Sequence, residues 1–182
     1  MSPLSSMAPT KSSKKSAVTE RWILNASPLI VLARTGHESL FLELADHLAA
    51  GMSTSLGARG VVPEDHPRYF HPLNRMALEA ARKEADLVLV VGGRLGELDT
   101  WGRAPSWGYP GEQKTIQIDA DPTSIGLNRP VDLGIVGDLG KVLPALLPLI
   151  EDRRHQVWIQ ELREWRDDTT QTDIINYEVD QL

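Results

Sequence analysis

The chain of 182 residues contains no cysteine, so it forms neither disulfide bonds nor thiolate metal sites. This absence fits a reducing compartment, and we expect a cytoplasmic protein. Long hydrophobic runs are missing too. The longest, near Leu29 and Leu87, end after about six residues, whereas a membrane-spanning helix needs about 20. We therefore expect no membrane association.

The chain also has no excess of positive charge. It contains 19 Lys and Arg and 25 Asp and Glu, so its net charge is −6. Nucleic-acid-binding proteins place cationic side chains against the phosphate backbone, so we expect no nucleic-acid partner. The five histidines lack the spacings typical of zinc sites, and no GxSxG motif accompanies them. Zinc enzymes and serine hydrolases therefore have no support in the sequence.

Enough apolar material is present for one core, because 41% of the residues are hydrophobic and a chain of this length is small for two domains. Residues 1–20 are rich in Ser, Pro and Lys and are predicted to form a disordered tail. A targeting segment is the alternative, although the apolar centre of a secretory signal is absent. The domain is expected over residues 21–152, and residues 153–182 are expected to form a C-terminal helix and tail.

Apolar spacing predicts how this domain is built. Residues 22–33 read as a buried strand that is interrupted at Ser27-Pro28 and begins properly near Leu29, because proline cannot donate to a central ladder. An unbroken apolar run, Leu87–Val91, predicts a strand buried on both faces. Shorter strands are expected over residues 52–55, 114–119 and 131–136. Helical spacing predicts two crossover helices, with the stripes Phe41, Leu44, Ala45, Leu48 and Leu73, Met76, Ala77, Ala80.

A third helix is expected after Asp138, which can cap it, and Pro144 is expected to kink this helix. The resulting order is strand, helix, strand, helix, three strands and a helix. With right-handed crossovers, this order predicts an α/β fold: a Rossmann-like doubly wound parallel sheet flanked by helices. Ligands of such sheets bind at the carboxyl edge of the strands.

Three groups of residues at that edge are candidate binding residues. Gly92, Gly93 and Arg94 follow the clearest strand, where glycines let backbone amides approach a phosphate and an arginine can add a charge-assisted contact. A tight turn with a solvated arginine is the simpler interpretation, since the spacing does not match GxGxxG.

Asp119 and Asp121 end the next strand, where a carboxylate can accept hydrogen bonds from ribose hydroxyls. The alternative is a turn in which Asp121 accepts backbone N–H groups ahead of Thr123. Gly137 and Asp138 form the third candidate, for which a helix cap is the favoured interpretation.

The loops carry further aromatic and charged residues. Trp101 and Trp107 can stack on an adenine or a flavin, but we expect them to fill the gap between loop and sheet. Arg59, Arg68 and His71 flank an irregular loop and are expected at the surface.

Four longer segments are more specific than any isolated glycine motif. They read STSLGARGVVPEDHP from Ser53, ADLVLVVGGRL from Ala85, TWGRAPSWG from Thr100 and IQIDADPTSIGLNRPVDLGIVGD from Ile116. Through them, the chain from about Pro28 to Trp165 resembles the central domain of thiamine-diphosphate enzymes, in particular acetolactate synthase-like proteins.

This resemblance implies a Rossmann-like domain that lies between two thiamine-diphosphate-binding domains and in some members holds FAD or ADP. Carried over, it places nucleotide contacts at Gly92, Gly93, Arg94, Asp119, Asp121, Gly137 and Asp138. Thiamine diphosphate and magnesium belong only to a complete enzyme, where a GDG motif and a later asparagine hold them. Here Leu139 follows Gly137-Asp138, and we expect no pyrimidine-binding domain ahead of it. The resemblance therefore implies an isolated central domain, nucleotide-binding or structural, that is not catalytic alone.

Two alternatives remain open. The chain can be a subunit that completes a thiamine-diphosphate enzyme with separate catalytic chains, or a homo-oligomer of its own. Residues 22–46 also resemble the start of PIN-type ribonucleases, whose metal site begins with an acidic residue where this chain has Asn25. That chemistry gathers several carboxylates around divalent cations, and Asp46 is the carboxylate that such a nuclease would need here.

Overall fold

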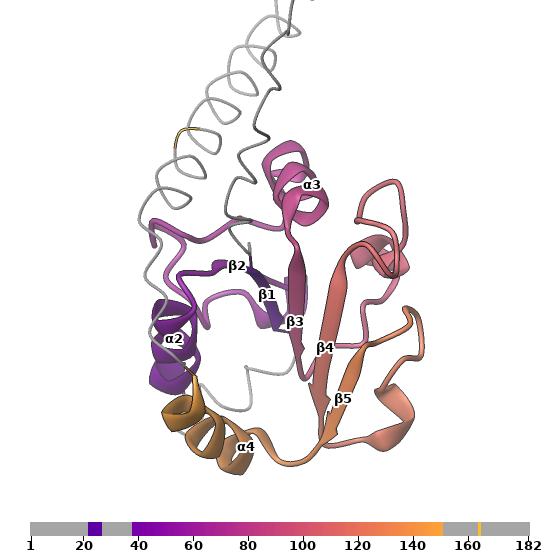
Figure 1. The fold of residues 1–182 in the computed structure, drawn as a ribbon. Coiled ribbons are helices and arrows are strands. Elements are labelled where there is room, and N and C mark those ends of the chain that lie inside the picture. The colour runs from indigo at the N-terminus through magenta and orange to yellow at the C-terminus, as the bar shows by residue number, and fades with distance from the viewer. Residues whose placement is uncertain (1–21, 27–37, 151–163, 165–182) are drawn as a thin grey trace, which may run out of the picture.

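The computed structural model describes residues 22–26, 38–150 and 164, and its centre is one parallel sheet (Figure 1). The strands are β1 (Trp22–Ala26), β2 (Gly51–Thr54), β3 (Leu87–Val91), β4 (Lys114–Asp119) and β5 (Leu133–Val136), in the order β2-β1-β3-β4-β5. All four neighbouring pairs are parallel. The order reverses between β1 and β3, as in doubly wound sheets, so the predicted Rossmann-like α/β fold is confirmed.

Helices cover both faces of the sheet. They are α2 (Glu38–His47), α3 (Arg75–Glu84) and α4 (Leu139–Leu146). Alternate residues of β3 face opposite sides: Leu89 and Val91 belong to the apolar cluster of α2 and α4, whereas Val88 and Val90 belong to that of α3. Figure 1 shows α2 and α4 side by side, away from α3. Both faces of β3 are therefore buried, as its unbroken apolar run predicts.

The first strand differs from the prediction. β1 ends at Ala26, before Ser27-Pro28, and does not begin near Leu29; residues 27–37 lie outside the described part. The physical reason is its place in the sheet, because β1 pairs with both β2 and β3, for example through Ile23 with Gly51 and Val88. A strand paired on both edges needs its backbone N–H groups, which excludes proline.

The predicted stripe of α3 is confirmed at Ala77 and wrong at Leu73 and Met76, which are 61% and 57% exposed. The buried residues of the helix are Ala77, Leu78, Ala81 and Arg82. Asn74 caps the helix by accepting the N–H of Ala77 at 3.2 Å, so the helix begins at Arg75 and its phase is set from there. One residue corresponds to a rotation of about 100°, which turns Met76 outward.

Helix α4 passes into a 3₁₀ turn, Leu147–Leu149, shortly after Pro144. Asp138 occupies the N-cap position, but its carbonyl and not its side chain accepts the N–H groups of Lys141 and Val142. Residues 1–20, and the C-terminal helix and tail expected over 153–182 apart from Glu164, lie outside the described part. None of the described helices has the length and apolar character needed to cross a bilayer.

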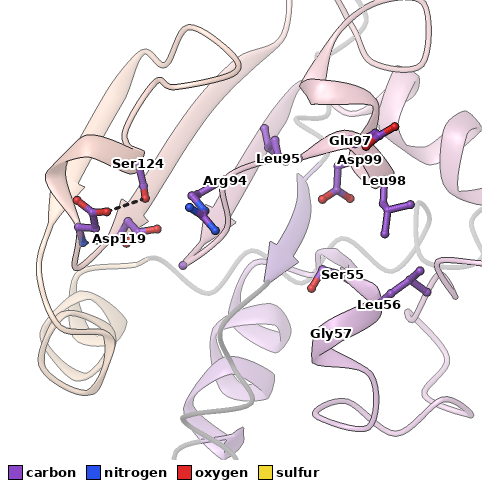
Figure 2. Close-up of a pocket in the computed structure, with 13 residues that line it drawn as sticks. Ser55, Leu56, Gly57, Arg94, Leu95, Glu97, Leu98, Asp99, Asp119 and Ser124 are labelled. Atoms are coloured by element: carbon purple, nitrogen blue, oxygen red, sulfur yellow. Dashed lines mark hydrogen bonds between the residues drawn. The ribbon is translucent and has the colours of Figure 1, made fainter.

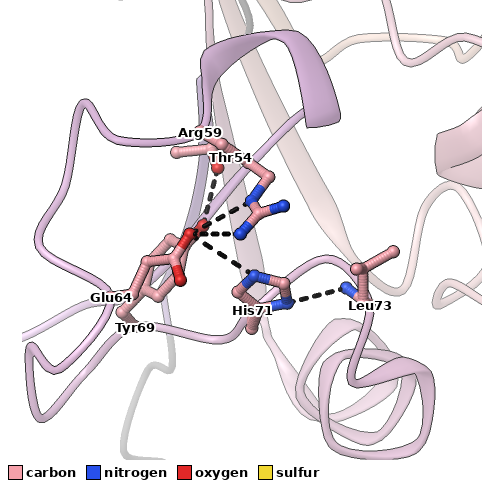
Figure 3. A network of polar contacts seen from close by, with 6 residues as sticks. All are labelled: Thr54, Arg59, Glu64, Tyr69, His71 and Leu73. Atoms are coloured by element: carbon pink, nitrogen blue, oxygen red, sulfur yellow. Dashed lines mark hydrogen bonds and ion pairs between the residues drawn. The ribbon is translucent and has the colours of Figure 1, made fainter.

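The loop between β2 and α3 is tied together by polar contacts (Figure 3). The Glu64 carboxylate accepts hydrogen bonds from Arg59 Nε and Nη2 at 3.0 and 2.8 Å, and lies 3.5 Å from His71 Nε2. Arg59 is exposed as expected, and His71 is partly covered. Arg68 corrects the prediction of a surface residue, because it is 8% exposed and forms an ion pair with Asp46.

Candidate functional site

A pocket of about 530 Å³ lies at the carboxyl ends of β2, β3 and β4 (Figure 2). Its volume is in the range of small-molecule sites, about 300–1,000 Å³. Three stretches line it, one after each strand: Ser55–Gly57, residues 92–99 except Gly93, and Asp119 with Asp121 and Ser124. The pocket therefore occupies the edge at which doubly wound sheets bind ligands.

Four of the seven predicted site residues come together here. Gly92, Arg94, Asp119 and Asp121 line the pocket, whereas Gly93, Gly137 and Asp138 do not. The N–H of Gly137 donates to the backbone oxygen of Asp119 at 3.0 Å, and a Cβ at Gly137 would lie 2.7 Å from Val142. Gly137 and Asp138 thus form the tight junction between β5 and α4, and Asp138 occupies the expected N-cap position without a capping hydrogen bond from its side chain.

The glycine pair shapes the turn after β3, but the Gly92 amide is not available to a phosphate. Gly92 has a φ of 63°, a conformation that favours glycine. Its N–H donates to the carbonyl of Ile118 at 2.6 Å, and the carbonyl of Gly93 accepts from Gln117 Nε2 at 2.9 Å. The turn is therefore bonded back to β4.

Asp121 organises the turn after β4, as the turn interpretation predicts. Its Oδ1 accepts the backbone N–H of Thr123 at 2.9 Å and the Thr123 hydroxyl at 2.7 Å. These two hydrogen bonds from Thr123 are the main cause that lowers the pKa of the Asp121 carboxyl, with a smaller contribution from the nearby Arg94 charge. Asp121 therefore stays ionised well into the acidic range.

Asp119 and Arg94 are the side chains best placed for a ligand. The Asp119 Oδ1 accepts the N–H of Asp121 at 2.9 Å, and no further side-chain hydrogen bond of Asp119 is found among the described residues, so Oδ2 can accept from a ligand. Arg94 is exposed and is the one cationic residue of the lining. Its backbone is held by Asn128, whose Nδ2 donates to the Arg94 carbonyl at 2.7 Å.

Sequence reasoning missed the wall formed by Ser55–Gly57 and by Leu95–Asp99. Asp99 accepts a hydrogen bond from Arg82 Nη2 at 2.7 Å, and its carbonyl accepts from Trp107 Nε1 at 2.8 Å. Trp107 is 1% exposed and fills the gap under the loop as expected, whereas Trp101 is 44% exposed and does not. Long-range contacts of this kind leave no spacing signal in the sequence.

A second pocket of about 360 Å³ adjoins the first and shares Ser55, Leu56 and Glu97–Asp99 with it. Around it, Leu56, Leu73 and Leu98 are exposed to solvent. The second pocket therefore combines an apolar rim with the buried ion pair of Arg82 and Asp99 at its wall.

The described residues do not form a divalent-metal site, because no group of three or more His, Asp or Glu side chains gathers in that part of the chain. Asp138 lies at a helix start outside the pocket, so the residues present do not fit thiamine diphosphate with magnesium. Asp46 forms an ion pair with Arg68, and nothing in the described residues favours the PIN-type ribonuclease.

Comparison with known proteins gives a consistent result. The family model "Thiamine pyrophosphate enzyme, central domain" matches residues 26–146. YdaP of Bacillus subtilis (strain 168), provisionally described as a thiamine pyrophosphate-containing protein, is 34% identical over 74% of this chain and 24% of its own length. The probable acetolactate synthase large subunit of Methanocaldococcus jannaschii is 29% identical over 85% of this chain and 26% of its own length.

A comparison with solved structures points to the same kind of protein. The X-ray structure of an enzyme from Mycobacterium smegmatis, provisionally described as thiamin diphosphate-dependent, is 30% identical with a TM-score of 0.58 and covers 75% of this chain and 26% of that one. The chain thus spans about a quarter of the length of the proteins it matches.

Proposed function

This chain belongs to the family of thiamine pyrophosphate enzyme central domains, and we propose that it binds an adenine nucleotide, ADP or FAD, in the pocket at the carboxyl edge of its sheet. One observation carries the proposal. The fold brings Arg94, from the end of β3, and Asp119, from the end of β4, into the lining of one 530 Å³ pocket. A cation and an acceptor are the two groups that a nucleotide needs.

Each side chain has a part in this proposal. The Arg94 guanidinium makes charge-assisted hydrogen bonds to the diphosphate, and Asp119 Oδ2 accepts from a ribose hydroxyl. Leu98, which also lines the pocket and is exposed, offers apolar contact to the base. The turn built by Asp121 fixes the direction of the Asp119 carboxylate.

We further propose that the chain is not catalytic by itself. Its relatives are about four times longer than the matched part, and the residues that the structure describes do not fit thiamine diphosphate. The proposal places thiamine chemistry in further domains or chains of a complete enzyme. It also places the protein in the cytoplasm, which the absence of cysteine supports.

Titration calorimetry with ADP and FAD tests the binding proposal. We expect saturable binding with a dissociation constant below about 1 mM, weakened at least tenfold, or about 1.4 kcal/mol, by Arg94→Met. Arg103→Met is the matched control, because Arg103 is an exposed arginine outside the lining. Absence of heat with both nucleotides at several millimolar would leave only a structural role.

A second candidate function is that of a subunit that assembles with separate thiamine-diphosphate-binding chains. The exposed Leu56, Leu73 and Leu98 around the second pocket favour it, because exposed apolar patches mark interaction surfaces. Native co-purification tests it, with loss of the partner on Leu73→Glu as the expected result. A monomer without any partner, or unchanged capture by the variant, counts against this function.

A further inference from the structure

The second pocket, of about 360 Å³, is large enough for a small molecule. We propose that it binds a small carboxylate with a short aliphatic chain, whose carboxylate is held by Arg82 and whose chain lies against the leucines of the lining. This site is separate from the proposed nucleotide site, because Arg82 lines only the second pocket and Arg94 lines only the first. Occupation of one site therefore does not require occupation of the other.

The Arg82 guanidinium is buried and held in place. Arg82 is 6% exposed, and its guanidinium carbon lies over the Trp107 ring, 4.5 Å from the ring centroid. Its Nη2 donates to the Asp99 carboxylate at 2.7 Å. Trp107 is fixed in turn, because its Nε1 donates to the Asp99 carbonyl at 2.8 Å. A ligand that contacts this guanidinium therefore does not have to order it first.

The same guanidinium has donors left for a ligand. A guanidinium carries five N–H donors, and the buried Nε of Arg82 has no hydrogen-bond partner among the described residues. Burial also lowers the pKa of Arg82, although the Asp99 charge opposes this shift, so one carboxylate does not fully compensate the buried cation. A ligand carboxylate supplies the missing acceptor and the missing negative charge, and carboxylates pair with arginine through strong charge-assisted hydrogen bonds.

The apolar part of the lining fits a short aliphatic chain. Leu78 lies one helical turn before Arg82 on the same face of α3 and is 3% exposed, whereas Leu56, Leu73 and Leu98 are 38%, 61% and 73% exposed. Covering apolar surface that is open to water is favourable. The pocket therefore offers contact to an apolar chain next to the guanidinium.

The other charged residues of the lining allow one negative charge on the ligand. Arg75 lies two turns before Arg82 on the same face of α3 and adds a second cation. Glu79, between them, forms an ion pair with Lys83 at 2.7 Å, which offsets its charge. Glu97 is exposed, so water screens its charge. A ligand with a single carboxylate fits this balance, whereas a polyanion would meet the acidic residues.

Titration calorimetry of the purified chain with hexanoate tests this site, and hexanamide is the matched probe without charge. We expect saturable binding of hexanoate and binding of hexanamide that is weaker by about tenfold or more, because charge-assisted hydrogen bonds are the stronger class. When the titration is followed by NMR, the signal of the Arg82 Nε–H group should shift. Arg82→Met should abolish the binding of hexanoate.

A pair of surface variants keeps the test independent of whether Arg82→Met folds. Leu73 and Leu127 are 61% and 60% exposed, and of the two only Leu73 lines the pocket. Leu73→Glu removes apolar contact and adds a negative charge near the ligand, so it should weaken hexanoate binding by about tenfold. Leu127→Glu should leave the affinity unchanged.

Four results would overturn the carboxylate site. Absence of saturable hexanoate binding at tens of millimolar would remove it outright, and equal affinity for hexanamide would show that the carboxylate is not recognised. An unshifted Arg82 signal, or equal weakening by Leu73→Glu and Leu127→Glu, would place the binding elsewhere. Absence of ADP binding would remove the proposed function and leave this site standing, because the two pockets have different arginines.

Discussion

The two faces of the sheet are held by different kinds of contact. On the face of α2 and α4, most buried side chains are apolar, among them Phe41, Leu44 and Leu143. On the face of α3, apolar residues share the interior with buried Arg82, Gln113 and Arg129. The first face is a helix-on-sheet interface, and the second also carries the loops that line the pocket.

Hydrogen bonds from buried polar side chains hold those loops. Arg129 is 2% exposed and donates from Nε to the Thr115 hydroxyl at 2.9 Å and from Nη1 to the carbonyls of Gly102 and Gly108 at 2.6 and 3.0 Å. Gln117 donates to the carbonyls of Gly93 and Ser124 and accepts the N–H of Gly126. The apolar face therefore supplies stability, while the polar face also positions the loops that line the pocket.

The largest effect is expected from a charge inside the sheet. Val90→Asp places a carboxylate at a fully buried position of β3, where no described side chain compensates it, and the expected cost is about 4 kcal/mol or more. Such a loss approaches the whole stability of a domain, about 5–15 kcal/mol. We expect no cooperative unfolding transition in circular dichroism. The same change at the edge, Leu133→Asp, should leave a folded protein, because Leu133 is half exposed.

The next prediction compares the two faces directly. Leu143→Ala on the apolar face and Arg129→Met on the polar face should each cost about 3 kcal/mol, the first through a cavity and the second through unsatisfied carbonyls of Gly102 and Gly108. Urea unfolding measures both. Only Arg129→Met should also weaken ADP binding, by about tenfold. Equal binding by the two variants would show that the polar face does not position the pocket.

A smaller effect on folding is expected at the pocket itself. Asp119→Ala should weaken ADP binding about tenfold, since hydrogen bonds to charged groups contribute about 1.5–3 kcal/mol, while the melting temperature falls by only about 2 °C. Asp119 is half-buried at a strand end, so its removal leaves no cavity in the core. Proportional losses of affinity and stability would contradict this placement.

The smallest predicted effect is on the stability of the protein at acidic pH. The pKa of the Asp121 carboxyl lies below its ordinary value of 3.8, mainly because of the Thr123 hydroxyl and amide. A lowered folded-state pKa means that the stabilisation is present above pH 3.8 and is lost as the pH falls through the lower folded value. Asp121→Asn should therefore reduce the loss of stability measured between pH 4 and pH 2. An unchanged acid profile would argue against the Thr123 contacts.

The sequence predicted the sheet well, because strand burial is a local property. The unbroken run Leu87–Val91 and the stripe of Phe41, Leu44, Ala45 and Leu48 gave β3 and α2 with their faces. The phase of α3 was wrong because the Asn74 cap, and not apolar spacing, fixes where that helix begins. The extent of β1 was wrong because its pairing on both sides is not visible in its own residues.

For the site, strand ends were predictable and loop contacts were not. Asp119 and Arg94 follow recognisable strands, so their meeting at one edge follows from parallel topology. The wall at Leu95–Asp99 depends on Arg82 and Trp107, which lie 17 and 8 residues from Asp99. The hydrogen bond from the Gly92 N–H to the Ile118 carbonyl likewise depends on the register between β3 and β4.

Residue-resolved NMR titration with ADP tests the central claim most directly, because it locates the ligand on the sheet. We predict saturable amide shifts concentrated at residues 92–98 and 119–124, with little change in α2 and α4. Shifts confined to other parts of the chain, or none at several millimolar ADP, would contradict a nucleotide site at this edge.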